Sequence, residues 1–138
     1  MLNIEIIKEF ATSLPFTSID FPFDNVTMTV KVKGKIFLFL PLDVFPFKFS
    51  FKVTPENNIE LKEKYDFITD AFHLNKKHWA TFDSQYKDLN SISEINIAKS
   101  LIYDSFVLVV NKLKVSEKYE IFEVLKQTPL DFRKVENY

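Results

Sequence analysis

The chain alternates apolar and polar residues over residues 26–32, in the pattern that predicts a strand with one face in water. Lys33-Gly34-Lys35 then predicts a tight turn, and residues 36–40 run back as a second strand. This return strand is apolar at every position. We therefore expect it to lie in the centre of a sheet, or to be covered on its second side by the C-terminal tail or by a partner.

The clearest strand covers residues 45–53, where proline, lysine and serine separate the apolar positions. Those positions are Phe45, Phe47, Phe49, Phe51 and Val53. Five apolar side chains on one face of a strand require a layer of helices above them. We therefore assign these phenylalanines to the core, and a surface on which nucleic-acid bases stack is the alternative.

Helical spacing of apolar residues predicts a first helix over roughly residues 2–12, ending before Pro15. Residues 17–25 read as a loop. Thr54-Pro55-Glu56 combines an N-cap residue, a proline at the first helical position and an acid, which predicts a short helix to about Tyr65.

The second half of the chain contains the longest predicted helix. Residues 66–75 read as a loop or an irregular strand, and residues 78–82 as a short strand. Ser91 and Glu94 have the spacing of a capping box, and the apolar stripe that follows them extends to Leu113. One more helix is expected over residues 116–126, followed by a polar tail.

This order of elements predicts an α/β domain of the α+β kind, with two layers and an antiparallel sheet whose helices pack on one face. The first and the longest helices would cover the phenylalanine face. We place the domain at residues 1–115 and treat residues 116–138 as a C-terminal extension, helical in part and packed on the same domain.

Composition then removes several classes of function. The net charge is −1, so binding to nucleic acid would have to rest on a local basic patch. The single glycine, Gly34, excludes glycine-rich phosphate loops, and the absence of cysteine excludes thiolate chemistry and disulfides. No segment predicts a signal peptide or a membrane span, so we expect a cytoplasmic protein. The abundance of Phe, Ile, Lys and Asn suggests a bacterial genome of low GC content.

The rarest residue types gather within residues 72–81, which contain both histidines and the only tryptophan. His73 and His78 are five residues apart, which does not fit a helical zinc motif, so we expect no metal and no cofactor. No serine lies in a glycine-flanked elbow, so we expect no catalytic residues and no enzyme. Trp79 is assigned to the core, Asn75 to local turn hydrogen bonds, and strand alternation would separate His78 from Lys77 and Trp79.

A set of motifs in fixed order extends over roughly residues 5–113. The most specific is a His-x-Asn-Lys-x-x-Trp-x-Thr element formed by His73, Asn75, Lys76, Trp79 and Thr81. The others are Pro22-Phe23, the hairpin at residues 32–37, Lys52 with Pro55, Asp104-Ser105-Phe106 and residues 109–113. In these motifs the chain resembles the MmcQ/YjbR family. The resemblance implies a two-layer fold similar to frataxin or to type III secretion chaperones, and DNA binding through a double wing of hairpins.

Three positions depart from the family pattern. Asp24 stands where the family usually has glycine, and Phe72 and Phe106 stand where it usually has tyrosine. The two phenylalanines remove hydroxyl groups, so a polar role at those positions is not expected here.

The leading functional hypothesis is therefore a non-enzymatic DNA-binding protein that contacts phosphates through lysines. Its candidate contacts are Lys31, Lys33, Lys35, Lys76, Lys77 and His78. The same lysines would also serve as solvated charges that protect a sheet edge from pairing. The alternative is a protein-interaction or homodimerising module, which would use the second face of residues 36–40 or the C-terminal segment.

Overall fold

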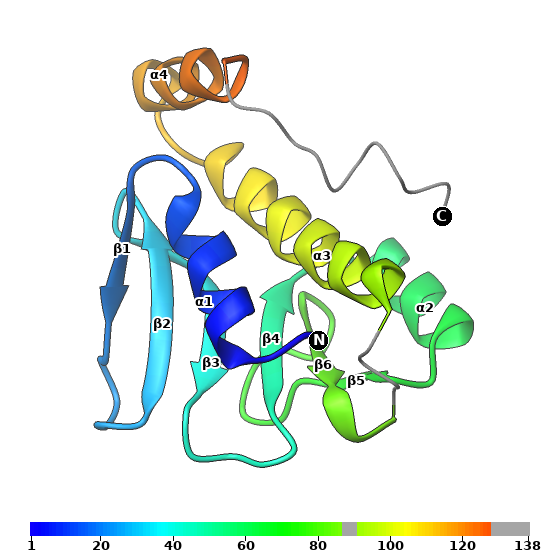
Figure 1. The fold of residues 1–138 in the computed structure, drawn as a ribbon. Helices are drawn as coiled ribbons and strands as arrows, with labels where there is room; N and C mark the ends of the chain where they lie inside the picture. Colours follow the sequence, from blue (N-terminus) through cyan, green and yellow to red (C-terminus); the bar gives the residue numbers. More distant parts are fainter. Residues whose placement is uncertain (87–90, 128–138) are drawn as a thin grey trace.

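The computed structural model of the protein describes residues 1–86 and 91–127, in which four α-helices accompany a six-stranded sheet (Figure 1). The helices are α1 (Ile4–Ser13), α2 (Pro55–Lys64), α3 (Ile92–Val110) and α4 (Val115–Leu125). The strands are β1 (Thr17–Asp20), β2 (Thr27–Val32), β3 (Lys35–Pro41), β4 (Lys48–Lys52), β5 (Ile68–Asp70) and β6 (Trp79–Asp83), and a 3-10 turn, η1 (Ser84–Tyr86), follows β6. Within residues 1–86 and 91–127 no helix is long and apolar enough to cross a membrane.

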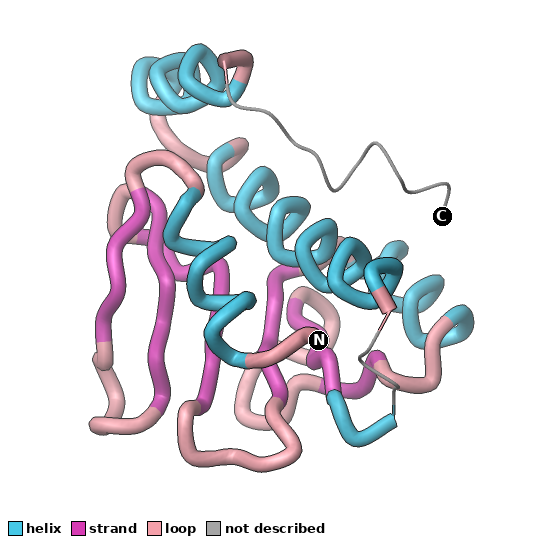
Figure 2. The backbone as a smooth tube through the Cα atoms, in the orientation of Figure 1, coloured by secondary structure: helices cyan, strands magenta, loops and turns pink. Residues whose placement is uncertain are grey.

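The sheet has the strand order β1-β2-β3-β4-β6-β5, and every neighbouring pair is antiparallel. Figure 2 shows the strands side by side with α1 and α3 lying across one face. The core lies between this face and the helices. The predicted α+β class, an antiparallel sheet with helices on one face, is confirmed.

The two edge strands are the elements that the sequence indicates least. β1 falls in residues 17–25, where a loop was predicted, so that prediction is wrong. β1 pairs only with β2, and three of its four residues are exposed, which leaves no apolar alternation to detect. β5 at the other edge has three residues and falls within the segment predicted as a loop or irregular strand.

The β2–β3 hairpin turns at Lys33 and Gly34, as predicted. Lys33 has φ +48° and Gly34 has φ +81°. Positive φ at both central residues is what a two-residue hairpin turn with the right-handed strand twist requires. The only glycine in the chain therefore has a structural role at this turn.

A β-bulge in β3 explains why this strand is apolar at every position. Val30 pairs with Leu38 but Lys31 pairs with Ile36, so Phe37 is an extra residue on β3. Phe37 and Leu38 are both fully buried, and Phe37 meets Phe106 of α3 edge to face at 5.3 Å between ring centroids. Ile36 and Phe39 remain half-buried. β3 lies between β2 and β4, so the prediction of a central strand is confirmed.

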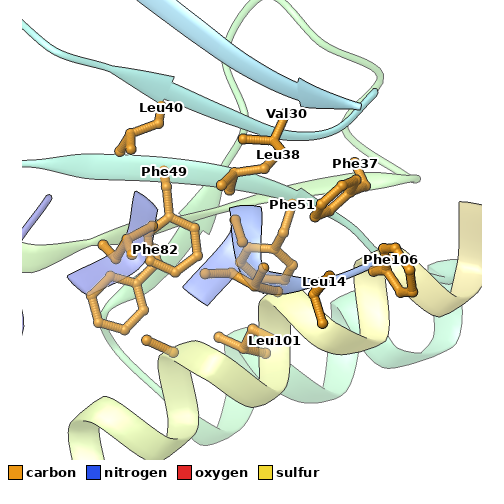
Figure 3. Packing of buried hydrophobic residues seen from close by; sticks show 14 of the residues in the cluster. Leu14, Val30, Phe37, Leu38, Leu40, Phe49, Phe51, Phe82, Leu101 and Phe106 are labelled. Atoms are coloured by element: carbon orange, nitrogen blue, oxygen red, sulfur yellow. The ribbon is translucent and has the colours of Figure 1, made fainter. Parts of the chain in front are cut away.

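The phenylalanine strand forms the core, as predicted, but it is shorter than the pattern suggested. Phe49 and Phe51 on β4 are buried with Phe82 of β6, whose ring stacks on Phe49 at 4.9 Å (Figure 3). Phe45 is 95% exposed and precedes the strand, so its assignment to the core is wrong. β4 begins only at Lys48, so the alternating pattern starts at Phe45, before the strand itself.

The caps predicted for α2 and α3 are observed. The Thr54 hydroxyl accepts a hydrogen bond from the backbone N–H of Asn57 at the start of α2. The Ser91 hydroxyl accepts one from the N–H of Glu94, the residue three positions later, at the start of α3. These side chains occupy backbone donors that have no partner inside the helix.

α4 packs on the rest of the structure through its inner side. Ile121 is fully buried and Leu125 is nearly so, and both belong to the same apolar cluster as the sheet and α3. Glu120 of α4 also forms an ion pair of 3.0 Å with Lys33 at the hairpin turn. The remainder of the predicted extension, residues 128–138, lies outside the described residues.

Ser105 of α3 joins the two halves of the sheet. β3 and β4 share only two register pairs, Leu38 with Phe51 and Phe39 with Ser50. Beyond them, the fully buried Ser105 hydroxyl donates to the Phe37 carbonyl at 2.6 Å and accepts from the Lys52 N–H at 2.7 Å. The hydroxyl thus replaces a backbone hydrogen bond where the two strands separate.

Replacing Ser105 with alanine removes both bonds and leaves a buried donor and a buried acceptor without partners. We expect the S105A variant to lose about 2 kcal/mol of unfolding free energy in urea denaturation, with an unchanged dependence on urea. The matched control is Ser100→Ala on the same helix, because the buried Ser100 hydroxyl has no hydrogen-bond partner among the described residues. Equal losses in the two variants would contradict the bridging role.

Candidate nucleic-acid interface

The hairpin turn and the loop that precedes β6 lie at the same end of the sheet. β4 runs antiparallel to β3, so Lys52 at its end lies on the side where the turn joins β2 to β3. Lys52 pairs in register with Trp79, the first residue of β6. Adjacent strands are about 4.8 Å apart, so β3 and β6 are separated by roughly 10 Å.

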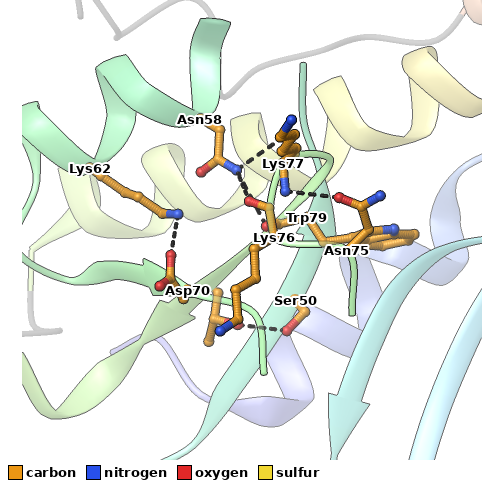
Figure 4. Close-up of polar contacts among 9 residues, drawn as sticks. Ser50, Asn58, Lys62, Asp70, Asn75, Lys76, Lys77 and Trp79 are labelled. Carbon is orange, nitrogen blue, oxygen red and sulfur yellow. Dashed lines mark hydrogen bonds and ion pairs between the residues drawn. The ribbon is translucent and has the colours of Figure 1, made fainter. Parts of the chain in front are cut away.

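Two asparagines hold the loop at residues 71–78 (Figure 4). The side-chain oxygen of Asn75 accepts a hydrogen bond from the N–H of Lys77 at 2.9 Å. The backbone carbonyl of Asn75 accepts from the N–H groups of His78 and Trp79. Buried Asn58 of α2 donates to the carbonyls of Lys76 and Lys77, at 2.7 and 3.2 Å. The turn role predicted for Asn75 is present, whereas the sequence offered no signal for Asn58.

The strand begins at Trp79, one residue later than predicted. The backbone carbonyl of Asn75 accepts a hydrogen bond from the N–H of His78, which keeps residues 75–78 in a turn. The alternation argument that assigned Lys77 and His78 to opposite faces of a strand therefore does not apply to them. His73 lies in the same loop, is exposed, and has a left-handed backbone with φ +70°.

Two of the predicted lysine contacts are compensated by carboxylates. Lys31 forms an ion pair of 2.8 Å with Asp20 of β1, and this hydrogen bond holds the pKa of Asp20 below its usual value. Lys33 pairs with Glu120 and lies 4.3 Å from the centre of the Phe16 ring. A phosphate at either lysine would have to compete with an attached carboxylate.

The other predicted lysine contacts lie with two lysines that belong to the sequence motifs but were not among the predicted phosphate contacts. Among residues 1–86 and 91–127, no ion pair forms at any of the five lysines in this group, which are Lys35, Lys52, Lys76, Lys77 and Lys112. Asp70 lies near Lys76 but pairs with Lys62. We call this group of five lysines the basic end of the sheet.

Lys52 is the best-defined member of the basic end. Burial lowers its pKa, and the nearby charge of Lys112 lowers it further. Two positive charges without a bound anion repel one another, so this pair of lysines favours a negatively charged ligand. Only the tertiary structure brings together these residues from β4 and from the turn after α3.

Trp79 does not lie in the core between sheet and helices, so its assignment there is wrong. Its register partner is Lys52, which places it on the face of the sheet opposite to α3, where it is half-buried. Its ring meets Phe39 edge to face at 5.1 Å, and Lys52 Nζ lies 5.9 Å from its centroid. Thr81, the last motif residue, is buried and hydrogen bonded to Ser50 at 2.8 Å.

Within the described residues, no catalytic or metal site is assembled around His73 or His78. In the described part of the chain, no group of three or more His, Cys, Asp or Glu side chains is placed to hold a metal ion. A groove of about 390 Å³ runs between α2 and α3, lined by Leu61, Tyr65, Ile97 and Asp104 among others. Neither His73 nor His78 lines this groove.

The fold and the loop at residues 71–78, which we call the motif loop, together define a two-layer α+β protein with a hairpin turn and this loop at one basic end. The sequence profile of the YjbR family matches residues 12–108, and the chain belongs to this family. The uncharacterized protein YbdF of Escherichia coli O157:H7 is 36% identical over 110 residues, covering 79% of this chain and 85% of YbdF.

Two solved structures share the fold. The Deinococcus radiodurans protein DR2400, with a DUF419 domain, superposes with a TM-score of 0.76 at 27% identity and 88% coverage of each chain. A structural-genomics target from Pseudomonas syringae superposes with a TM-score of 0.60 at 25% identity, covering 78% of this chain and 98% of its own.

The proximity of Lys52 and Lys112 can be measured directly. Replacing Lys112 with glutamine removes the repelling charge but leaves Lys52 equally buried, so the pKa of Lys52 should rise part of the way towards 10.5. An NMR titration of the lysine side chains measures this pKa. A Lys8→Gln variant on α1 serves as the control and should leave it unchanged, and an unchanged pKa in K112Q would contradict the assembled basic end.

Proposed function

We propose that this YjbR-family protein is a non-enzymatic nucleic-acid-binding protein whose basic end contacts phosphates. The observation that carries the proposal is the convergence at one end of the sheet of five lysines that have no ion pair within the described residues. They come from the hairpin, β4, the motif loop and the turn after α3. Phosphate contacts by lysine provide most of the affinity of non-specific binding to nucleic acids.

A net charge of −1 requires that nucleic-acid binding rest on a local basic patch, and the basic end provides one. Acidic side chains compensate the lysines elsewhere, as Asp20 does for Lys31 and Asp70 for Lys62. The basic end keeps its positive charge, and the repulsion between Lys52 and Lys112 would be relieved by an anion. A local patch of this kind attracts phosphates even when the whole chain is nearly neutral.

Salt dependence tests this function. Binding of the full chain to a fluorescent duplex and to a single strand should weaken linearly with the logarithm of salt concentration. K35Q and K77Q should each reduce the slope by about 1, because each variant loses one phosphate contact. K33Q should reduce it less, since Glu120 already compensates Lys33.

The matched control is K8Q, which removes the same charge from α1 on the helical face. It should bind as the unmodified protein does. An absence of binding to both probes at about 50 mM salt, where phosphate contacts are strong, would contradict the proposed function. Equal losses in K8Q and K77Q would contradict its location.

Self-association is a second candidate function, favoured by the outer side of α4. Val115 and Tyr119, four residues apart, lie on the same side of the helix and are each 67% exposed. If they form a dimer contact, light scattering should show a dimer that a Tyr119→Ser variant converts to monomer. A monomer at all concentrations in the unmodified chain would dismiss this candidate.

A further inference from the structure

The open face of the sheet, opposite to α1 and α3, carries three aromatic rings in contact. Phe23 comes from the β1–β2 loop, Phe39 from β3 and Trp79 from β6. Phe23 and Phe39 are stacked at 6.2 Å between centroids with an angle of 19° between their planes. Phe39 meets Trp79 at 5.1 Å. We call these three residues the aromatic row.

The turn that follows Phe23 is held by hydrogen bonds of the next residue. The carboxylate of the next residue, Asp24, accepts from the N–H groups of Val26 and Thr27 at 2.9 and 2.6 Å. These backbone hydrogen bonds, that of Thr27 first, lower the pKa of Asp24, so the turn is held by a charged acceptor. The Phe23 side chain nevertheless remains 69% exposed. A ring that is already stacked on Phe39 loses less entropy on binding a flat ligand than an isolated side chain does.

The polar groups beside the aromatic row already have partners. Ser50 and Thr81 share a hydrogen bond of 2.8 Å, and the Thr29 hydroxyl donates to the Asp20 carbonyl at 3.0 Å. Thr29 and Ser50 are the register neighbours of Phe39 on the two adjacent strands. Thr29 and Thr81 are also buried, so ring surface rather than hydroxyl groups dominates the centre of this face.

Positive charge lies at one end of the row. Lys52 Nζ is 5.9 Å from the centroid of Trp79, and Lys76 and Lys77 immediately precede the Trp79 strand. A ligand with flat rings at regular spacing and a phosphate beside each ring matches this combination of aromatic and basic groups.

We propose that the aromatic row is a stacking platform for single-stranded nucleic acid, with bases on Phe23 and Trp79 and phosphates at Lys52 and the basic end. This proposal rests on the proposed function and specifies its substrate. Bases in a duplex are stacked on one another and present only their edges, whereas those of a single strand can stack on protein rings. Because Thr29 and Thr81 are buried beside the row, base edges meet few exposed hydroxyls there, and recognition is tolerant of sequence.

The only tryptophan of the chain is in the aromatic row, so its fluorescence reports binding directly. Titration of the full chain with an oligothymidylate of about 10 nucleotides, within the usual site size, should quench this fluorescence. Binding should be tighter to that strand than to a duplex of equal length.

The decisive variant is Phe23→Ala, because the exposed ring contributes little to folding and its loss removes one stacking surface. We expect about tenfold weaker binding of the single strand and unchanged binding of the duplex. Phe45→Ala is the matched control, since Phe45 is 95% exposed and has no ring contact within the described residues. It should bind as the unmodified protein does.

The results separate this proposal from the function on which it rests. If K77Q weakens binding but F23A and F45A both leave single-strand affinity unchanged, the platform is wrong and phosphate binding stands. If neither single strand nor duplex binds, the proposed function itself fails. If F23A instead dissociates a dimer seen by light scattering, the row is a contact between two copies of the chain, and the proposal is overturned.

Discussion

The junction between β3 and β4 is the constraint on which the rest of this structure depends. β1, β2 and β3 form one half of the sheet, and β4, β6 and β5 form the other. Only two register pairs join the halves directly, and the Ser105 hydroxyl extends that junction from α3. A buried group bonded on both sides is costly to remove, because its partners cannot turn to water instead.

The candidate interface is a consequence of that junction. The hairpin turn belongs to one half of the sheet, and Trp79 with its preceding loop belongs to the other. Lys52 lies where they meet, since its N–H bonds to Ser105 and its register partner is Trp79. The helices occupy a single face, which leaves the opposite face to the aromatic row. Charge and ring surface thus come together at an edge that neither half contains alone.

Local chemistry explains which parts of the fold could be predicted. The caps at Thr54 and Ser91 and the turn at Gly34 act within four residues, so their positions follow from short patterns. The prediction failed where the determining contact is distant. β1 exists because it pairs with β2, and the bulge at Phe37 follows from packing against Phe106, neither of which a local pattern contains. The strand predicted from alternation was also too long, because it began at Phe45 whereas β4 begins at Lys48.

The sequence by itself determined the α+β class, the family and most helix ends, because periodicity, capping and a specific motif are properties of neighbouring residues. The tertiary structure decided which lysines remain uncompensated and where Trp79 points. Asp20 and Glu120 neutralise Lys31 and Lys33, whereas Lys52 and Lys112 come together with no ion pair to any residue that the structure describes. Ion pairs and ring contacts depend on distances of a few ångströms between residues far apart in the chain. Strand register sets those distances, and the sequence does not display that register.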